Sequence, residues 1–508
     1  MTEIDRQVPE GELTRRVVVA GGGVAGWMAA AALARSLGSR ASVLVIDEGG
    51  DDLSLGGLSD FEASLPSIRR FNARLGLDEA ELFSSRGAGF GLGIVFTGWH
   101  RADRSYMQPF GEVGAPIGAI AFHQLAGRAR AEGATIRLAD YSLAALCAQA
   151  GRFARPSTDG RSPLSSYDYG LHLRLTDYAA ALKRAAERFG ARSKPARVDG
   201  LDRRPDGAIA ALRLSDGERI EGDLFLDCTG SEARLLSEVS PAFVDWRAWL
   251  PCDRAISGSA RDDRIPPLYV HAEAHGAGWR RSIPLDGFRS ETLFYASDSL
   301  SDERAHEACR SALEPSEGPL RRSAVRTGHR REIWSGNCIG LGASAAVLDP
   351  IESPTLHLLQ NALTRLISLF PAAARPPVEA AEYNRLTVSE LERARDLAIL
   401  HYKANAREGE TLWDRCRALE VPESLAWKIE LYRSRGRVPL YDEEVYDETA
   451  WIMAFDEQGL RPRRYDPLAN GIEPSRIEAH FRRLREAIIG AARDVPPYGD
   501  YLRRQRAA

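Results

Sequence analysis

A glycine-rich turn near the N-terminus carries the clearest chemical pattern in the sequence. It has the GxGxxG spacing, and its candidate cofactor-binding residues are Gly21, Gly23, Val24, Ala25 and Gly26. An apolar run, Val17–Val19, precedes the turn, and the pattern predicts a helix over Trp27–Leu37. In such a strand–turn–helix, glycines let the backbone approach a pyrophosphate, and the helix N-terminus presents free N–H groups. The pattern predicts a dinucleotide site; the alternative is a glycine-rich turn that binds nothing.

Acidic residues and distant return segments indicate which dinucleotide would bind. The candidate cofactor-binding residues beyond the turn are Asp47, Glu48, Val198, Asp227, Gly342 and Ala343. The first two follow a second predicted strand, about 20 residues past the turn, where an acid accepts ribose hydroxyls. Asp227 ends another apolar strand, and Gly342 lies in a small-residue turn much farther along. Segments this far apart favour FAD over a compact NAD domain, although each alone is also consistent with an ordinary buried strand end.

Composition excludes several classes of protein. The chain has 508 residues, 44% of them hydrophobic, and a net charge of −4, so it can form a large core and shows no basic surface for nucleic acid. Its six cysteines form no CxxC pair, which argues against a metal centre or a disulfide frame and favours a reducing compartment. The first sixteen residues are polar, and no apolar run reaches about 18 residues. We expect a cytoplasmic protein with no nucleic-acid, membrane or metal partner.

The order of the predicted elements divides the chain into three parts. Strands and helices alternate over residues 1–235 and 325–370, which predicts a discontinuous FAD-binding α/β lobe of the Rossmann type (GR2-like). Residues 236–324 are rich in predicted strands and form an insert. Residues 371–508 are charged and mostly helical in pattern, which predicts a C-terminal cap.

Five segments resemble the flavin-dependent tryptophan halogenases. They are residues 62–66, 249–255, 278–284, 337–353 and 465–468. The third reads GWRRSIP and is similar to the family's GWxWxIP signature, with Arg281 in place of the second tryptophan. The fourth ends in Asp349-Pro350-Ile351-Glu352-Ser353, like the corresponding family segment. The resemblance covers nearly the whole chain.

This resemblance implies a chemistry and a set of partners. In the family, a separate reductase supplies reduced FAD by diffusion, and oxygen and halide then give hypohalous acid. The acid travels through a tunnel to an electron-rich aromatic substrate, usually an indole. A lysine ammonium handles the electrophilic halogen, and a glutamate stabilises the cationic arene. Glu352 matches that glutamate, although a helix-entry acid is the alternative. A homodimer is one alternative for the assembly.

The resemblance also implies residues around the substrate and halide. They are Ser353, Pro354, Thr355, Trp279, Pro284 and Phe110. Trp279 and Pro284 would separate flavin from substrate, or would simply pack in the core. Ser353 and Pro354 also have the pattern of an N-cap followed by a first helical residue, with the helix running to about residue 370. The C-terminal region would help to close the substrate pocket through Tyr441, Tyr446, Glu448 and Trp451, or would be an ordinary helical face.

The sequence departs from the family where the halogen is handled. Gly91, in Gly89-Phe90-Gly91-Leu92-Gly93, occupies the lysine position, and none of the chain's four lysines precedes residue 183. Arg86 is close in sequence, and Lys403 is a distant candidate for rescue. Pro354 lacks the N–H with which the family would hold a halide, and Gln108 replaces a substrate-pocket histidine.

Three functions therefore compete. The first is halogenation of an indole or another aromatic compound. The second is a flavin monooxygenase or oxidase that has lost halogen transfer. The third is a flavin-binding protein without catalysis. Gly91 favours the second and third functions, and the nearly complete set of motifs favours the first.

Overall fold

The computed structural model describes residues 15–49, 58–83, 86–314, 316–371 and 377–507. The predicted loop at residues 49–60 lies mostly outside these ranges. Among the described residues, no helix is long and apolar enough to cross a membrane, and no cluster of His, Cys, Asp or Glu side chains could hold a metal ion.

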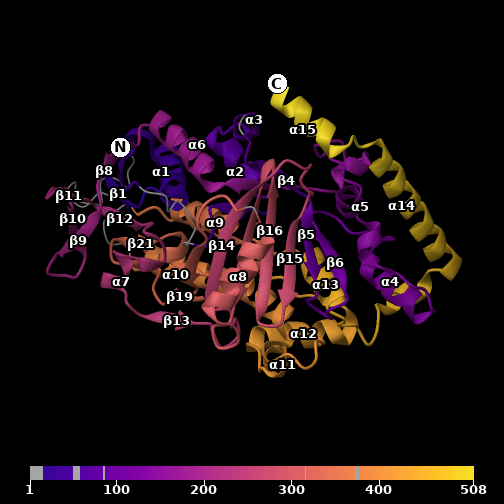
Figure 1. The fold of residues 1–508 in the computed structure, drawn as a ribbon. Helices are drawn as coiled ribbons and strands as arrows, with labels where there is room; N and C mark the ends of the chain where they lie inside the picture. The colour runs from indigo at the N-terminus through magenta and orange to yellow at the C-terminus, as the bar shows by residue number, and fades with distance from the viewer. Residues whose placement is uncertain (1–14, 50–57, 84–85, 315, 372–376, 508) are drawn as a thin grey trace.

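A six-stranded sheet forms the centre of the N-terminal lobe (Figure 1). Its strands in spatial order are β20 (Trp334–Ser335), β21 (Cys338–Gly340), β12 (Leu224–Asp227), β1 (Arg16–Ala20), β2 (Ser42–Asp47) and β8 (Arg192–Pro195). β1 pairs in parallel with β2 and β12, and only β20 runs antiparallel to its neighbour. This confirms the predicted α/β lobe and brings the ends of β1, β2 and β12 to one edge.

Alternating side chains of β1 pack into two different cores. Val17 and Val19 belong to the large core that includes α1 (Val24–Leu37), whereas Val18 and Ala20 pack toward a small antiparallel sheet. That sheet consists of β9 (Val198–Arg203), β10 (Ile209–Leu214) and β11 (Arg219–Glu221). Because neighbouring residues of a strand face opposite sides, the continuous apolar run of β1 is explained by burial on both faces.

A seven-stranded sheet forms the middle of the molecule (Figure 1). Its strands in spatial order are β18 (Arg321–Ala324), β14 (Arg254–Asp262), β17 (Gly287–Tyr295), β16 (Gly278–Leu285), β15 (Val270–His275), β5 (Gly93–Thr97) and β6 (Ser105–Pro109). The last two strands come from the part of the chain that the sequence analysis placed in the FAD-binding lobe. The sheet therefore crosses the predicted boundary at residue 236, because β5 pairs in parallel with β15.

Two further small sheets complete the β structure. One contains β3 (Phe61–Ala63), β7 (Gly170–Arg174) and β4 (Ala88–Gly91), and the other contains β13 (Phe243–Asp245), β19 (Gly328–Arg330) and β22 (Ala346–Val347). β7 pairs with both β3 and β4, so His172 lies opposite Ala63 on one side and Gly89 on the other.

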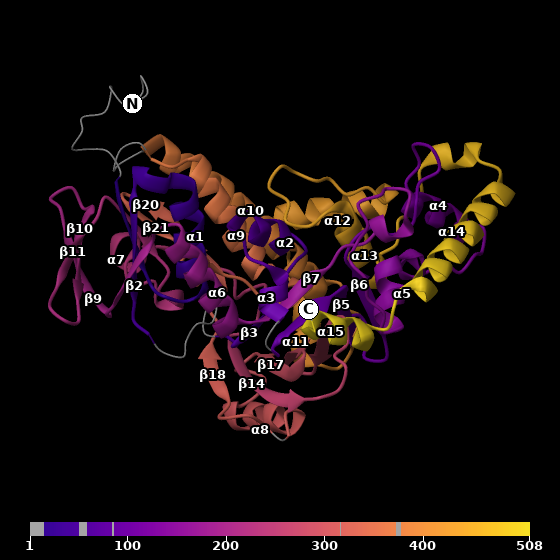
Figure 2. The same cartoon turned by 90° about the horizontal axis from the view of Figure 1, so that it is seen from above.

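Helices surround these sheets. Those before residue 371 are α1, α2 (Ile68–Leu75), α3 (Glu79–Phe83), α4 (Phe122–Ala131), α5 (Leu143–Gln149), α6 (Leu175–Arg188), α7 (Leu236–Val239), α8 (Asp302–Ala312) and α9 (Thr355–Ser368). The later ones are α10 (Pro377–Lys403), α11 (Thr411–Ala418), α12 (Glu423–Arg435), α13 (Glu448–Glu457), α14 (Pro474–Asp494) and α15 (Tyr498–Ala507). Figure 2 shows β9, β10 and β11 at one end of the molecule and α4 and α14 at the other. The helical C-terminal region is confirmed.

Candidate active site

The glycine turn between β1 and α1 leaves no room for side chains. A Cβ atom on Gly26 would lie 1.8 Å from the carbonyl oxygen of Gly21, and one on Gly22 would lie 1.9 Å from Asp47 Oδ1. Gly21 has a φ of 109°, which favours glycine. α1 has no side-chain cap and no acidic residue in its first turn. The turn therefore fits a pyrophosphate, which would meet backbone N–H groups at the positive end of the helix.

We expect Gly26→Val to weaken FAD binding by about tenfold or more, because the new side chain must displace the backbone of Gly21. Gly490→Val is the matched control, since a Cβ atom there meets nothing within 4 Å. Titration of each purified variant with FAD, followed by flavin fluorescence, measures the change. Equal affinity in the two variants would place the cofactor elsewhere.

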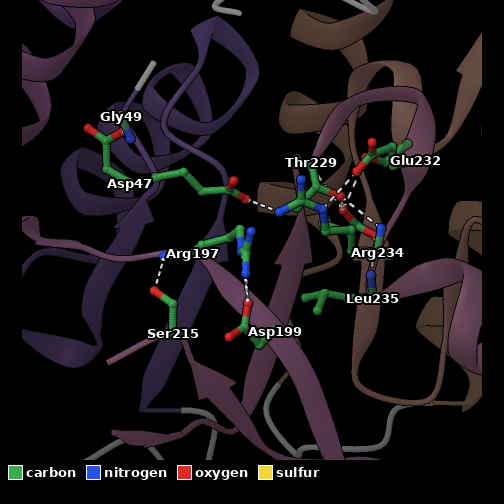
Figure 3. Close-up of polar contacts among 12 residues, drawn as sticks. Asp47, Gly49, Arg197, Asp199, Ser215, Thr229, Glu232, Arg234 and Leu235 are labelled. Carbon is green, nitrogen blue, oxygen red and sulfur yellow. Dashed lines mark hydrogen bonds and ion pairs between the residues drawn. The ribbon is translucent and has the colours of Figure 1, made fainter. Parts of the chain in front are cut away.

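Asp47, the first of the two predicted ribose acids, lies against this turn, because a Cβ atom on Gly22 would meet its carboxylate; Figure 3 shows Asp47 and Arg234. Asp47 ends β2, accepts a hydrogen bond from Gly49 N at 3.1 Å and lies 3.7 Å from Lys183 Nζ. Glu48 is ion-paired with Arg234, which also donates to Glu232 at 2.8 Å. Both carboxylates thus lie at the carboxyl end of β2, where a dinucleotide's ribose is bound in folds of this kind.

Asp227 is fully buried and accepts hydrogen bonds from two separate segments. Its donors are Thr229 N at 3.0 Å, Thr229 Oγ1 at 2.6 Å, Leu235 N at 2.9 Å, Leu236 N at 2.7 Å and Ser344 Oγ at 3.1 Å. Gly342, two residues before Ser344, has a φ of 63° and lies against Ala25 of α1. The carboxylate therefore joins the segment after β12 to the distant 342–344 turn and brings both to the glycine turn. Val198 lies nearby in β9, buried in the small core.

A small apolar pocket of about 60 Å³ lies beside this junction. Its lining includes Gly342, Ala343, Leu348, Thr355 and Leu358, with Tyr383 and Glu390 as polar members. The pocket thus connects predicted cofactor-binding residues with one of the predicted halide residues.

The Glu352 carboxylate is buried, and both of its oxygens are hydrogen-bonded. Gln108 Nε2 donates to Oε2 at 3.1 Å, and His401 Nε2 lies 2.6 Å from Oε1. Gln458 Nε2 contacts Tyr106 Oη at 2.9 Å and His401 Nδ1 at 3.2 Å. One polar cluster therefore joins side chains from four places in the fold: β6, α10, the short helix Pro350–Glu352, and the residue that follows α13.

The residues after Glu352 differ from the prediction. Ser353 has a φ of 53°, its hydroxyl makes no cap hydrogen bond, and no partner for it occurs among the described residues. The expectation that Ser353 is the N-cap and Pro354 the first helical residue is wrong: Pro354 precedes α9, which begins at Thr355. The left-handed conformation at Ser353 turns the chain sharply between the carboxylate and α9. A strained residue of this kind often marks a functional site.

Gly91 leaves a space that the ring of His172 fills. A Cβ atom on Gly91 would lie 2.6 Å from His172 Nε2. Burial, together with the charge of Arg281, lowers the pKa of His172 to about 4, so the ring is neutral at pH 7. Its Nδ1 lies 2.7 Å from the carbonyl oxygen of Pro284 and therefore carries the proton. Nε2 is thus a lone-pair acceptor beside the position where the family has lysine.

No cation from the candidates named above reaches this position. Lys403 Nζ donates to the carbonyls of Arg417 and Leu419 at 2.6 and 2.5 Å, beyond the end of α10. Arg86 is half-exposed and pairs with Asp263 at 2.7 Å. The other lysines, at positions 183, 194 and 428, are ion-paired with acids elsewhere. The rescue by Lys403 that the sequence left open is therefore not supported.

Arg281 brings a buried charge to the face of β16 that also carries Trp279. It is 1% exposed, and its Nη1 lies 2.8 Å from Glu62 Oε1. Trp279 is fully buried and stacks on Phe294, with ring centroids 4.6 Å apart. Arg281, which replaces the family's second tryptophan, is thus ion-paired with Glu62. Glu62 belongs to residues 62–66, another segment that resembles the family. Phe110 lies at the end of β6, near Gly170.

The C-terminal region contributes one of its four predicted residues to the surroundings of Glu352. Burial, and then the charge of Glu352, raise the pKa of Tyr446. Trp451 is fully buried and donates to Glu444 at 3.2 Å, whereas Tyr441 is 45% exposed. Glu448 begins α13. Tyr446 is therefore the member of this group whose hydroxyl is influenced by the charge of Glu352.

Asp349 should make stability depend on pH. Burial raises the pKa of Asp349 to about 6, above the value of about 3.9 in an unfolded chain. The folded form then binds the proton more tightly, so the wild type loses stability as the pH rises from about 4 to about 6. Asparagine does not titrate, so Asp349→Asn should lack this loss. Between pH 4 and pH 6 we expect the thermal midpoint of the variant to rise relative to that of the wild type, by the equivalent of about 2 kcal/mol. Tyr402, 2.7 Å from Oδ2, can donate to the new amide oxygen. A midpoint difference that stays constant from pH 4 to pH 8 would contradict this expectation.

His401 and His172 were not among the residues that the sequence predicted for the site. His401 lies inside the buried run Leu397–Tyr402 of α10, and a single histidine in such an apolar run needs a polar partner. That signal was available from the sequence, but it could not identify Glu352 as the partner. Nothing in the sequence links His172 to Gly91, because the contact depends on the pairing of β4 with β7.

The tryptophan halogenase family model matches residues 16–474 of the chain. Among solved structures, Xcc4156, a flavin-dependent halogenase from Xanthomonas campestris, is 35% identical with a TM-score of 0.91, and the match covers 97% of this chain and 98% of that one. BrvH, a flavin-dependent halogenase from Brevundimonas sp. BAL3, is 34% identical with a TM-score of 0.90, over 97% and 99%. The tryptophan 6-halogenase SttH from Streptomyces toxytricini is 28% identical over 96% of this chain and 97% of that one.

The fold and the site therefore define a flavoprotein oxidoreductase with a buried glutamate beside a flavin lobe. The chain belongs to the tryptophan halogenase family, whose members are flavin-dependent enzymes.

Proposed function

We propose that this protein uses FAD, reduced by a separate reductase, together with oxygen and halide to halogenate an indole or another electron-rich aromatic compound. The observation that carries the proposal is the Glu352 carboxylate, buried and fixed by Gln108 and His401 in a chain that belongs to this family. The relatives named above act on tryptophan or are described as flavin-dependent halogenases.

Reduced FAD, when bound, would supply the two electrons and two protons that, together with one further proton, convert oxygen and halide into hypohalous acid and water. The glycine turn would hold its pyrophosphate, and Asp47 or Glu48 its ribose. Thr355, which has the first N–H after Pro354, would face the halide. Trp279 and Pro284 would keep the flavin side apart from the substrate side. The placement of Asp47 and Gly342 at the glycine turn, and of Thr355 in the wall of the adjoining pocket, supports the roles of the turn, the ribose acid and the halide residue.

Glu352 would act on the aromatic ring. Electrophilic attack places a positive charge on the ring, and a fixed carboxylate in a site without water stabilises that charge strongly. The ring then loses its proton while the carbon–halogen bond remains, and the Glu352 carboxylate would accept that proton. Phe110 and Tyr446 would contribute to the walls around the substrate.

The test is an assay with a flavin reductase, NADH, FAD, chloride or bromide, and a panel of indoles. Mass spectrometry should show a product whose mass changes with the halide. If the protein binds FAD but gives no halogenated product from any panel member, halogenation is ruled out for that panel and the second candidate below gains weight.

Gly91 and His172 favour a second candidate, a flavin monooxygenase. The side chain beside Gly91 is a neutral imidazole rather than an ammonium group, and Pro354 offers no N–H to a halide. This candidate predicts an oxygenated product that forms equally well without halide. Substrate-dependent turnover of either kind would exclude the third reading, a flavin-binding protein without catalysis.

A further inference from the structure

The hydrogen-bond donors around Glu352 form a directed chain. Gln458 Nε2 lies 2.9 Å from Tyr106 Oη and 3.2 Å from His401 Nδ1, and His401 Nε2 lies 2.6 Å from Glu352 Oε1. An amide nitrogen only donates, so His401 Nδ1 must accept and the ring proton must be on Nε2. That proton points at the carboxylate. Gln108 Nε2 likewise donates a hydrogen bond to the other carboxylate oxygen, Oε2.

We propose that His401 is a positioning residue: its Nε2–H, fixed in direction by Gln458 and Tyr106, holds the Glu352 carboxylate in one orientation toward the substrate. This inference rests on the proposed function of Glu352 and extends its support to Gln458 and Tyr106. Each carboxylate oxygen of Glu352 meets one donor, so the orientation of the group is fixed before substrate arrives.

Packing keeps the imidazole in place. His401 is fully buried and stacks on Phe96, with ring centroids 4.6 Å apart and planes 13° apart, while Trp99 meets it edge-on at 5.8 Å. Tyr106 stays protonated because burial, and then the charge of Glu352, raise its pKa. Tyr106 Oη lies 3.4 Å from His401 Nδ1, so its hydroxyl proton is a second donor to Nδ1 beside the amide of Gln458. Two donors thus exclude a proton on Nδ1.

Two substitutions separate positioning from packing. His401→Phe keeps the ring that stacks on Phe96 but removes the donor, and His401→Gln keeps a donor on a side chain of similar reach. We expect kcat for halogenation to fall about 100-fold in His401→Phe, the loss typical of a misplaced reacting group, with KM and FAD affinity nearly unchanged. His401→Gln should recover a substantial part of that loss. Equal kcat in His401→Phe and the wild type would overturn the proposal.

A spectroscopic measurement tests the tautomer without catalysis. In ¹⁵N-histidine-labelled protein, the His401 resonances, assigned by their loss in His401→Gln, should show a protonated Nε2 and a bare Nδ1. Tyr106→Phe combined with Gln458→Leu should allow the proton to exchange between the two nitrogens. Tyr178→Phe, which removes another buried hydroxyl that donates to Asn72, is the control and should change nothing. A proton on Nδ1 in the wild type would overturn the proposal. Because this readout needs no product, it holds even if the halogenation assay fails.

Discussion

Glu352→Gln should abolish most of the halogenation while the protein folds and binds FAD normally. The substitution removes the negative charge that would stabilise the cationic ring, and loss of one preorganised electrostatic group costs about 100- to 1000-fold in kcat. Folding should survive because the new amide can be satisfied in place. Its oxygen can accept from His401 Nε2, and its NH₂ can donate to Gln108 Oε1 once the Gln108 amide turns over; that oxygen has no partner among the described residues in the wild type.

Halide-dependent product formation per unit of FAD-loaded protein measures this effect. Glu291→Gln is the matched control, since Glu291 is equally buried but lies in β17 and pairs with Arg289 at 2.7 Å. The control should keep its activity. If Glu352→Gln remains within threefold of the wild type in kcat, the carboxylate does not stabilise the reacting ring, and the proposed role is incorrect.

Gly91→Lys alone should destabilise the protein and should not restore a typical family site. The new Cβ atom would lie 2.6 Å from His172 Nε2, and the ring cannot move away without losing its hydrogen bond to Pro284. Forced overpacking of this kind costs about 1–3 kcal/mol. Gly91→Lys combined with His172→Ala removes the obstacle, so the double variant should be more stable than the sum of its single changes predicts.

Thermal midpoints and product yields of the two single variants and the double variant form the test. Gly91→Ala serves as the control, because it adds the same Cβ atom without the ammonium group and should show the same coupling to His172→Ala. Additive effects within about 0.5 kcal/mol would mean that the imidazole does not occupy the space beside Gly91. A gain in halogenation in the double variant, beyond the wild type, would show that the remaining pocket still accepts the chemistry of a lysine.

Together, these two predictions describe a site with a fixed anion and no adjacent ammonium group. The carboxylate is held by neutral donors from Gln108 and His401, and the place beside Gly91 holds a neutral imidazole. The side chain beside Gly91 therefore offers a lone pair on His172 Nε2 rather than a proton donor. We expect any difference from other family members in halide, substrate or reaction to arise from this replacement of lysine by glycine and a neighbouring imidazole.

The cofactor lobe was the part most readable from the sequence. The apolar run of β1, the GxGxxG turn and the acids after β2 are consecutive in the chain, and each step depends on backbone geometry over a few residues. The same holds for β12, whose predicted apolar strand ends at Asp227 in the structure as well. Ser353 was misjudged because a serine before a helix usually caps it, and here the chain takes a left-handed turn instead.

The sequence by itself determined the family, the flavin lobe, and the glutamate on which the proposed chemistry depends, because all three are encoded in short contiguous motifs. Only the tertiary structure decided how that glutamate is held and what replaces the lysine. His401 is 49 positions from Glu352, and His172 is 81 positions from Gly91. Contacts over such separations depend on strand pairing and helix packing, in which every side chain is constrained by neighbours from elsewhere in the chain, and no local pattern of residues specifies them.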